Sequence, residues 1–285
     1  MRIMITGAKG QLGTELSTLL DSTHHDVLGV DLDHGRNTLD ITDRDLTVGA
    51  ICEWRPELIL HGAAFTAVDR CETEPETAYL VNSLATRSIA DGARRVDAHV
   101  VYLSTDYVFD GTKSGPYVEW DQPCPQSIYG ASKLGGEMEI DPAWTIARTS
   151  WVCSPHGANM VKTVMGLASG TGPLSFVDDQ VGNPTFADDL AAMVLKLGVG
   201  RMPGTFHVTN AGSVSWYEFV REILMAAGGE PERVLPITTA ELSPPRPARR
   251  PANSVLDNMA LRHSGLGELD DFRIPLRRCV DRLLA

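Results

Sequence analysis

The chain has 285 residues, of which 43% are hydrophobic and 22% charged, and its formal net charge is -12. This composition is ordinary for a folded globular protein and excludes a fibrous or largely disordered chain. The negative charge argues against a broad surface for nucleic acid or anionic membranes, because such surfaces need many Lys and Arg side chains. An anionic ligand would therefore need a local basic site.

The cysteines and the N-terminal residues indicate a cellular compartment. The five cysteines are odd in number, widely spread and never arranged as C-x-x-C, which favours free thiols in a reducing environment. The histidines show no metal-ligand spacing, so we assign no metal. The N-terminal stretch lacks the pattern of a signal peptide, and no apolar run approaches the roughly 18 residues of a membrane span. We therefore expect a cytoplasmic protein.

The first half of the chain alternates apolar strands with amphipathic helices. A strand at residues 1–7 precedes a glycine-rich turn, after which leucines recur at helical spacing from Leu12 to Leu20. Further strands are predicted at 26–32, 57–64, 99–109 and 143–152, and helices at 46–56, 76–95 and from about Tyr129. Apolar strands that alternate with helices indicate an α/β fold with a parallel sheet covered on both faces. Beyond residue 150 the pattern becomes irregular, and proline-rich segments predict loops.

The segment TGAKGQLG places Gly7, Gly10 and Gly13 directly after the first predicted strand. Glycines there permit a tight turn, close approach of the backbone to a ligand and close packing of helix and strand. The helix N-terminus presents unpaired N–H groups to a pyrophosphate. The motif therefore predicts a Rossmann-type doubly wound fold that binds NADH or NADPH, with Gln11 and Leu12 also at the cofactor.

Asp31 closes the second predicted strand, where dinucleotide-binding folds place an acid on the ribose hydroxyls. A carboxylate there favours NADH, because it repels the 2′-phosphate of NADPH. Lys9 and Arg36 could offset that preference, so the choice of cofactor stays open, and Asp31 could also serve only as a turn residue. Asp40 and Ile41 follow a short loop and are expected to frame the adenine.

Tyr129 and Lys133 stand four residues apart at the predicted helix start, so their side chains share one face of the helix. Beside a nicotinamide, Lys133 would bond the ribose and lower the pKa of the Tyr129 phenol from its usual value of about 10. Tyr129 would then protonate a carbonyl oxygen as hydride reaches the carbon. Thr105, near the end of the strand 99–109, is the expected hydroxyl donor to that carbonyl.

The segment SPPRPARRP holds the densest basic cluster of this acidic chain, formed by Arg246, Arg249 and Arg250. It is either an exposed linker or a site for a diphosphate. Prolines restrict its backbone, and arginine can form planar bidentate bonds to phosphate oxygens. We expect Arg249 or Arg250 to bind the substrate.

The ordered motifs of the chain resemble those of the dTDP-4-dehydrorhamnose reductase family, within the extended short-chain dehydrogenase/reductases. The resemblance spans nearly the whole chain and rests on TGAKGQLG, LDITD, HGAAFTAVDRCETEPE, VN, STDYVFDG, YGASKLGGE, RTSWV, DDQVGNPT and RRPANSVLDN. It implies NAD(P)H-dependent reduction of the 4-keto group of a nucleotide-linked 6-deoxyhexose, most closely dTDP-4-dehydro-L-rhamnose.

The same resemblance implies roles for particular residues. Ala64, Phe65 and Thr66 should border the cofactor, Thr105 and Asp106 the sugar, and Trp151 should pack against the hexose. His61 and Gly62 depart from the commoner asparagine–alanine entry to their strand. Some members bind magnesium through C-terminal acidic residues at a dimer contact; this sequence gives no position for them, so homodimerisation stays open.

The resemblance also implies a division of the chain into two parts. Residues 1–150 and 183–235 should form the dinucleotide-binding domain. Residues 151–182 and 236–285 should form a smaller substrate-binding region.

Three other functions stay open. The chain could reduce another dTDP-4-keto-6-deoxy sugar of secondary metabolism. An epimerase or dehydratase would use the same Tyr and Lys with a cofactor that stays bound, although Tyr107 follows Asp106 where a dehydratase would have a glutamate. A non-catalytic NADP-binding regulatory subunit would keep the fold, and the intact Thr105, Tyr129 and Lys133 argue against it.

Overall fold

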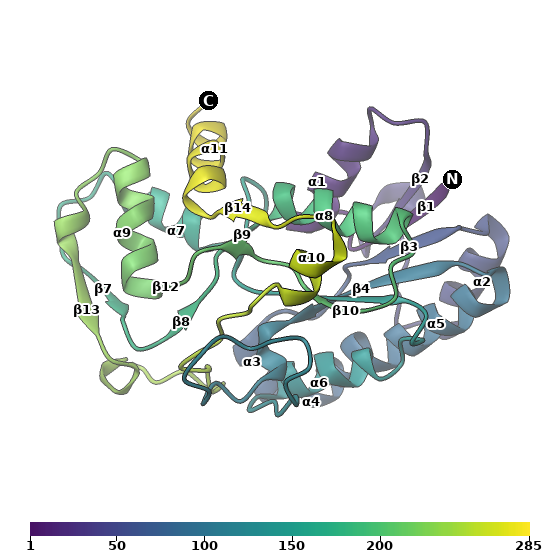
Figure 1. Ribbon diagram of the computed structural model, residues 1–285, viewed down its shortest axis with the longest axis horizontal. Helices are drawn as coiled ribbons and strands as arrows, with labels where there is room; N and C mark the ends of the chain where they lie inside the picture. Colours follow the sequence, from purple (N-terminus) through teal and green to yellow (C-terminus); the bar gives the residue numbers. More distant parts are fainter.

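A computed structural model describes residues 1–285, and its centre is a six-stranded parallel sheet of order β10-β5-β4-β3-β1-β2 (Figure 1). The chain order reverses direction at β1, which has β2 on one side and β3 on the other. In sheets of this kind the ligand crevice lies beyond the carboxyl ends of the strands, at that reversal. The predicted Rossmann-type doubly wound fold is confirmed. The sheet strands are β1 (Arg2–Thr6), β2 (Asp26–Val30), β3 (Leu58–His61), β4 (His99–Thr105), β5 (Thr145–Thr149) and β10 (Gly204–His207).

Helices cover both faces of the sheet. The strands carry apolar side chains on both faces, because successive residues point to opposite sides. Ile3 and Ile5 of β1 belong to one buried cluster, and Met4 between them belongs to another. The first cluster lies under α1 (Gln11–Leu20) and α8 (Ala187–Val199). The second lies under α2 (Arg44–Trp54) and α5 (Ala85–Val96), with α6 (Ile128–Glu137) on the same side in Figure 1.

The segment between β3 and β4 differs from the single helix predicted at 76–95. It contains α3 (Val68–Thr73), α4 (Pro75–Tyr79) and a π-helical turn, η2 (Leu80–Leu84), before α5. π-Helical turns are rare and frequently occur at functional sites. Here the turn contains the buried Asn82, which is hydrogen-bonded to Ser132 of α6.

The C-terminal part has a separate apolar core between α7 (Met160–Leu167), α9 (Trp216–Ala226) and α11 (Arg273–Leu284). Because α9 packs there and β10 joins the large sheet, we propose that the dinucleotide-binding domain ends just after β10, not at residue 235. The smaller elements are β6 (Val152–Cys153), β7 (Leu174–Val177), β8 (Val181–Gly182), β9 (Thr185–Phe186), β11 (Asn210–Ala211), β12 (Val214–Ser215), β13 (Val234–Ile237), β14 (Leu269–Asp271), α10 (Met259–Ser264), η1 (Gly35–Asn37), η3 (Asp106–Val108), η4 (Pro231–Arg233) and η5 (Thr239–Glu241).

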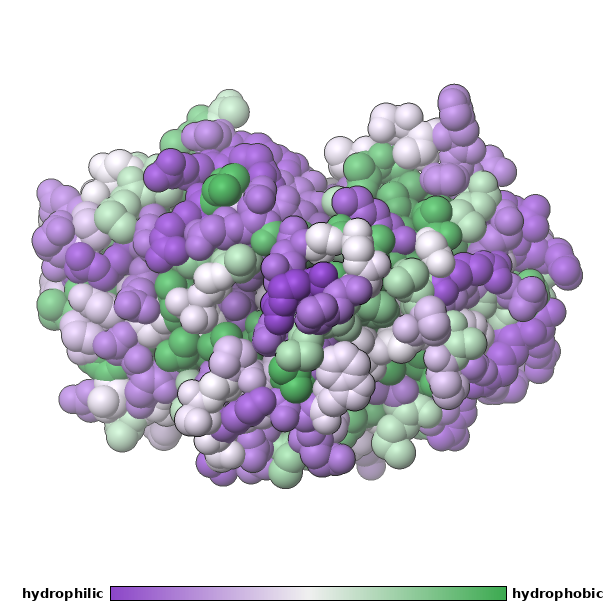
Figure 2. All heavy atoms as spheres, viewed as in Figure 1, coloured by the Kyte–Doolittle hydropathy of each residue, from purple (hydrophilic) through white to green (hydrophobic).

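The surface is a mixture of hydrophilic and apolar residues. On the face drawn in Figure 2, hydrophilic residues cover most of both ends, and apolar residues lie in small groups nearer the centre. No helix is both long and apolar enough to cross a membrane.

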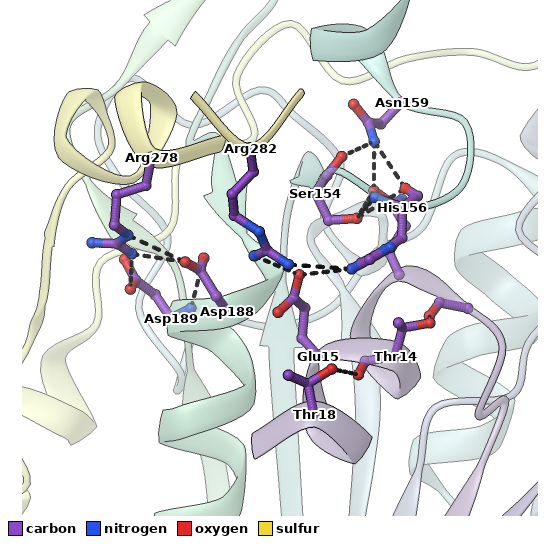
Figure 3. A network of polar contacts seen from close by, with 12 residues as sticks. Thr14, Glu15, Thr18, Ser154, His156, Asn159, Asp188, Asp189, Arg278 and Arg282 are labelled. Atoms are coloured by element: carbon purple, nitrogen blue, oxygen red, sulfur yellow. Dashed lines mark hydrogen bonds and ion pairs between the residues drawn. The ribbon is translucent and has the colours of Figure 1, made fainter. Parts of the chain in front are cut away.

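Ion pairs hold α11 against the nucleotide-binding fold (Figure 3). Arg282 Nη1 lies 2.9 Å from Oε1 of the buried Glu15 on α1, and His156 Nε2 lies 3.2 Å from the same oxygen. Arg278 of α11 contacts Asp188 of α8 at 3.0 Å. Helix α1, which begins at the glycine turn, is therefore held against the C-terminal helix α11.

Removing the cation beside Glu15 should destabilise the fold. We expect Arg282→Ala to lower the free energy of unfolding by about 1–3 kcal/mol, because it leaves a buried carboxylate short of a charged partner. Arg277→Ala is the matched control, since Arg277 is exposed on the same helix and forms no ion pair. Denaturant unfolding measures both; equal stability of the two variants would contradict the role of the Arg282 pair.

Candidate active site

A groove of about 500 Å³ lies at the carboxyl ends of β1, β3 and β4. Its size falls within the usual range for cofactor sites. It brings together most residues predicted to bind the cofactor, namely Gly7, Gly10, Gln11, Leu12, Gly13, Asp31, Asp40, Ile41, Ala64, Thr66, Tyr129 and Lys133. Phe65 does not line this groove; its ring lies under the guanidinium of Arg70 instead, 5.1 Å from the centroid to Cζ.

The glycine turn fits the pyrophosphate of a dinucleotide. Gly7 has a φ of +72°, and a Cβ on Gly13 would lie 2.1 Å from the Gly7 carbonyl oxygen, so side chains are excluded at both positions. Gly10 caps α1 without any side-chain hydrogen bond, which leaves N–H groups of the first turn free for an anion.

Asp31 both lines the groove and holds the turn. Its Oδ2 accepts a hydrogen bond from the Lys9 amide at 2.9 Å, and its Oδ1 accepts one from the Leu32 amide at 2.8 Å. The Lys9 ammonium lies 3.6 Å from the exposed Asp33, which draws this cation toward solvent. The turn-residue and ribose-acceptor interpretations of Asp31 are therefore compatible.

Replacing Asp31 should change the choice of cofactor. We expect Asp31→Ala to lower kcat/KM for NADH on the order of tenfold more than for NADPH, because only NADH offers a free 2′-hydroxyl to the carboxylate. Asp33→Ala is the control, since it removes a nearby exposed carboxylate. Equal losses with the two cofactors would contradict the assignment.

Helix α6 presents Tyr129 and Lys133 to the groove, as the spacing predicted. Ser127 caps the helix by accepting a hydrogen bond from the Gly130 amide at 3.1 Å. A Cβ on Gly136 would lie 2.1 Å from the Tyr102 hydroxyl oxygen, so a glycine there allows α6 to press against β4. Tyr129 and Lys133 are both buried, at 9% and 3% exposure.

The predicted direction of the Tyr129 pKa shift is wrong. Burial raises the pKa of the Tyr129 phenol, Thr105 partly offsets the rise, and the charge of Asp106 adds to it. Burial also lowers the pKa of Lys133 to about 7, against the opposing effect of Glu137. Tyr129 is therefore a protonated phenol at neutral pH, which suits a proton donor, and the charge of Lys133 is the group sensitive to pH.

The hydroxyl of Thr105 and the carboxylate of Asp106, at the start of η3, lie near Tyr129. The Thr105 hydroxyl donates to Asp106 Oδ1 at 2.9 Å and accepts from the Tyr107 amide at 3.2 Å. Burial raises the pKa of Asp106 to about 6, although hydroxyls of Ser254 and Thr105 favour its charged form. The Tyr107 ring meets the Tyr129 ring edge-on at 5.4 Å.

His61, the departure from the family pattern, has a structural role. One ring nitrogen lies 2.7 Å from the Thr6 hydroxyl and the other 3.1 Å from the Thr86 hydroxyl, which ties β1 and β3 to α5. Burial, helped by the charge of Lys133, lowers the pKa of His61 to about 3, so the ring is neutral.

Three polar residues at or beside the groove are not among the predicted site residues. Asn82, quoted only as part of a motif, accepts from the Phe65 amide at 2.8 Å and donates to the Ser132 hydroxyl at 2.9 Å. Ser104 and Thr149 line the groove from the ends of β4 and β5, and the Thr149 hydroxyl is buried without a partner. Their position at strand ends was the available signal.

Trp151 has an unusual backbone, with a φ of +45°. Its ring stacks on Trp216 of α9 with centroids 3.5 Å apart and an interplanar angle of 8°. A Cβ on Gly182 would lie 2.7 Å from the Trp151 ring, so this glycine leaves room for the indole. Trp151 does not line the cofactor groove.

The basic cluster lies near Tyr107: burial raises the pKa of that phenol, and the charge of Arg250 partly offsets the rise. Arg250 is already paired with Asp69, whose Oδ2 lies 2.8 Å from Nη2, and Arg246 lies 3.9 Å from the same carboxylate. Arg249 forms no ion pair and only reaches Gln126, at 3.4 Å. Of the three, Arg249 is the one without an ion pair to a protein carboxylate, and its binding to the substrate stays a prediction.

No group of three or more His, Cys, Asp or Glu side chains is arranged to hold a metal ion.

The doubly wound sheet, the glycine turn and the paired Tyr129 and Lys133 are those of a short-chain dehydrogenase/reductase.

Comparison with known proteins narrows this class. The family described as the RmlD substrate binding domain matches residues 1–285. The chain is 38% identical to the dTDP-4-dehydrorhamnose reductase of Burkholderia thailandensis over 304 residues, covering 100% of both chains. It is 40% identical over 292 residues to a probable dTDP-4,6-dihydroxy-2-methyloxan-3-one 4-ketoreductase of Streptomyces antibioticus, covering 100% of this chain and 96% of that one.

A solved structure supports the same family assignment. The dTDP-4-dehydrorhamnose reductase of Bacillus anthracis, determined in complex with NADP, superposes with a TM-score of 0.93 at 38% identity over 99% of each chain. The chain belongs to the dTDP-4-dehydrorhamnose reductase family of the extended short-chain dehydrogenase/reductases.

Proposed function

We propose that this protein is an NAD(P)H-dependent reductase of the 4-keto group of a nucleotide-linked 6-deoxyhexose, with dTDP-4-dehydro-L-rhamnose as substrate and dTDP-L-rhamnose as product. The observation that carries the proposal is that Tyr129 and Lys133 face a groove that begins at the glycine turn. Family membership supports the substrate class.

The residues of the site have defined tasks in this proposal. The nicotinamide supplies the hydride when bound. Thr105 orients the carbonyl of the sugar, and Tyr129 gives its phenolic proton to the oxygen as negative charge develops there. A phenol with a raised pKa still suits this task, because the alkoxide that it protonates is far more basic. Lys133 stabilises the resulting tyrosinate by its charge and holds the ribose.

The decisive test is product analysis. Purified protein is incubated with NADPH and dTDP-4-dehydro-L-rhamnose, and the products are identified by chromatography and NMR. Oxidation of NADPH with formation of dTDP-L-rhamnose is expected. Intact NADPH binding without turnover of any dTDP-4-keto-6-deoxy sugar would favour a regulatory subunit.

A second substrate is favoured by one observation. The Streptomyces antibioticus relative, at 40% identity, is named for reduction of a different dTDP-linked ketosugar. Competition between the two kinds of ketosugar in one assay would decide between them, because the preferred substrate has the higher kcat/KM.

A cytoplasmic location and homodimerisation remain predictions from the sequence. Cell fractionation and analytical ultracentrifugation would test them.

Removing the phenolic hydroxyl should abolish proton donation. We expect Tyr129→Phe to lower kcat by about 10² or more, the usual scale for general acid catalysis, with NADPH affinity nearly unchanged. Tyr79→Phe, which alters a phenol exposed on α4, is the control. Wild-type turnover in Tyr129→Phe would show that another group donates the proton.

The basic cluster should act on the sugar nucleotide alone. We expect Arg249→Ala to raise KM for the sugar nucleotide by the equivalent of about 1.5–3 kcal/mol, the range for a charge-assisted hydrogen bond, and to leave KM for NADPH unchanged. Arg250→Ala, measured alongside, also frees Asp69 and should destabilise the fold. Unchanged kinetics in both variants would show that the cluster does not bind the sugar nucleotide.

A further inference from the structure

Lys133 has few groups nearby to balance its charge. Its Nζ lies over the Tyr102 ring, 4.0 Å from the centroid, and its side chain is almost fully buried. Burial raises the pKa of Tyr102 well above its ordinary value, so this phenol is neutral. His61 on β3 is neutral as well, because burial lowers its pKa to about 3. Neither neighbouring strand supplies an anion.

One buried carboxylate lies a helical turn further along α6. Glu137 accepts a two-pronged hydrogen bond from Arg148 of β5, with Nε to Oε1 at 2.9 Å and Nη2 to Oε2 at 2.7 Å. The hydroxyl of Ser104 on β4 also donates to Oε1, at 2.5 Å. The side chains of Glu137 and Arg148 are each only 6% exposed. Two buried cations, Lys133 and Arg148, therefore share one buried anion.

The surroundings of α6 offer Lys133 no second anion of this kind. The titratable and charged groups that face Lys133, Glu137 or Tyr129 are Tyr102 on β4, His61 on β3, Arg148 on β5, Asp106 and Tyr107 on η3 and Cys71 on α3, with His207 on β10 behind Arg148. Asp106 acts on the Tyr129 phenol, and Glu137 is the charged group that acts on Lys133.

We infer that Glu137 is a positioning residue for the reaction: its carboxylate, fixed by Arg148 and Ser104, keeps the proton on Lys133 and so preserves the charge that stabilises the tyrosinate. The inference rests on the proposed role of Lys133. Glu137 itself does not line the groove and has no contact with the reacting atoms. Arg148 reduces the effect of Glu137 on Lys133, because the same carboxylate also balances the charge of Arg148.

Two variants separate this electrostatic role from a structural one. Glu137→Gln keeps the shape of the side chain but removes the anion and leaves the Arg148 charge unbalanced. The double variant Glu137→Gln with Arg148→Met removes both charges. Glu139→Gln is the matched control. Glu139 is also paired with an arginine, since its Oε1 lies 2.7 Å from Nη2 of Arg87, but this pair is nearer the surface.

The readout is the titration of Lys133, followed by NMR of protein labelled with [¹³Cε]lysine, with Lys133→Met to identify the signal. We expect Glu137→Gln to lower the titration midpoint by about 1–3 pH units, the usual effect of one nearby charge. The double variant should fall between Glu137→Gln and the wild type, and Glu139→Gln should match the wild type. The high-pH limb of kcat should move down with the midpoint in the same order.

The outcomes distinguish this inference from the proposed function. A Lys133 midpoint that stays at the wild-type value in both Glu137 variants overturns the inference, as does a shifted midpoint with an unmoved kcat profile. If Glu137→Gln fails to fold, the double variant carries the same test without an unbalanced buried cation. Failure of the wild-type protein to oxidise NADPH overturns the proposed function, while the NMR titration still tests the effect of Glu137 on the charge of Lys133.

Discussion

A lysine that is only 3% exposed must keep a positive charge in a place where water cannot solvate it. Much of the site follows from this constraint. The Tyr102 ring lies beside the ammonium, His61 stays neutral between two threonines, and Glu137 provides the compensating charge. The charged form of Lys133 and the protonated phenol of Tyr129 are thus favoured by different causes. The Glu137 carboxylate favours the charge of Lys133, and burial favours the protonated phenol.

The sheet explains how such distant residues meet. Ser104 and Arg148 are opposite one another in the register of β4 and β5, and Glu137 on α6 joins both. The π-helical turn η2 brings Asn82 to Ser132 and to the loop after β3. Glycines 130 and 136 permit the close packing of α6 that these contacts require.

Local patterns in the sequence predicted the fold and the core of the site, because their information lies within a few residues. The glycine turn, the strands of the sheet and the spacing of Tyr129 and Lys133 are of this kind. The direction of the Tyr129 pKa shift was wrong because burial is a property of the folded chain. Arg250 could not be separated from Arg249 either, since its partner Asp69 lies 181 residues away.

The proposed reaction delivers hydride to C4 of the sugar and takes a proton from the protein. The most direct measurement uses NADPH carrying deuterium at the transferable position of the nicotinamide and dTDP-4-dehydro-L-rhamnose as acceptor. We expect deuterium at C4 of the hexose in the released product, with one NADPH consumed for each sugar reduced. A product without deuterium at C4, or a converted sugar without net consumption of NADPH, would contradict it.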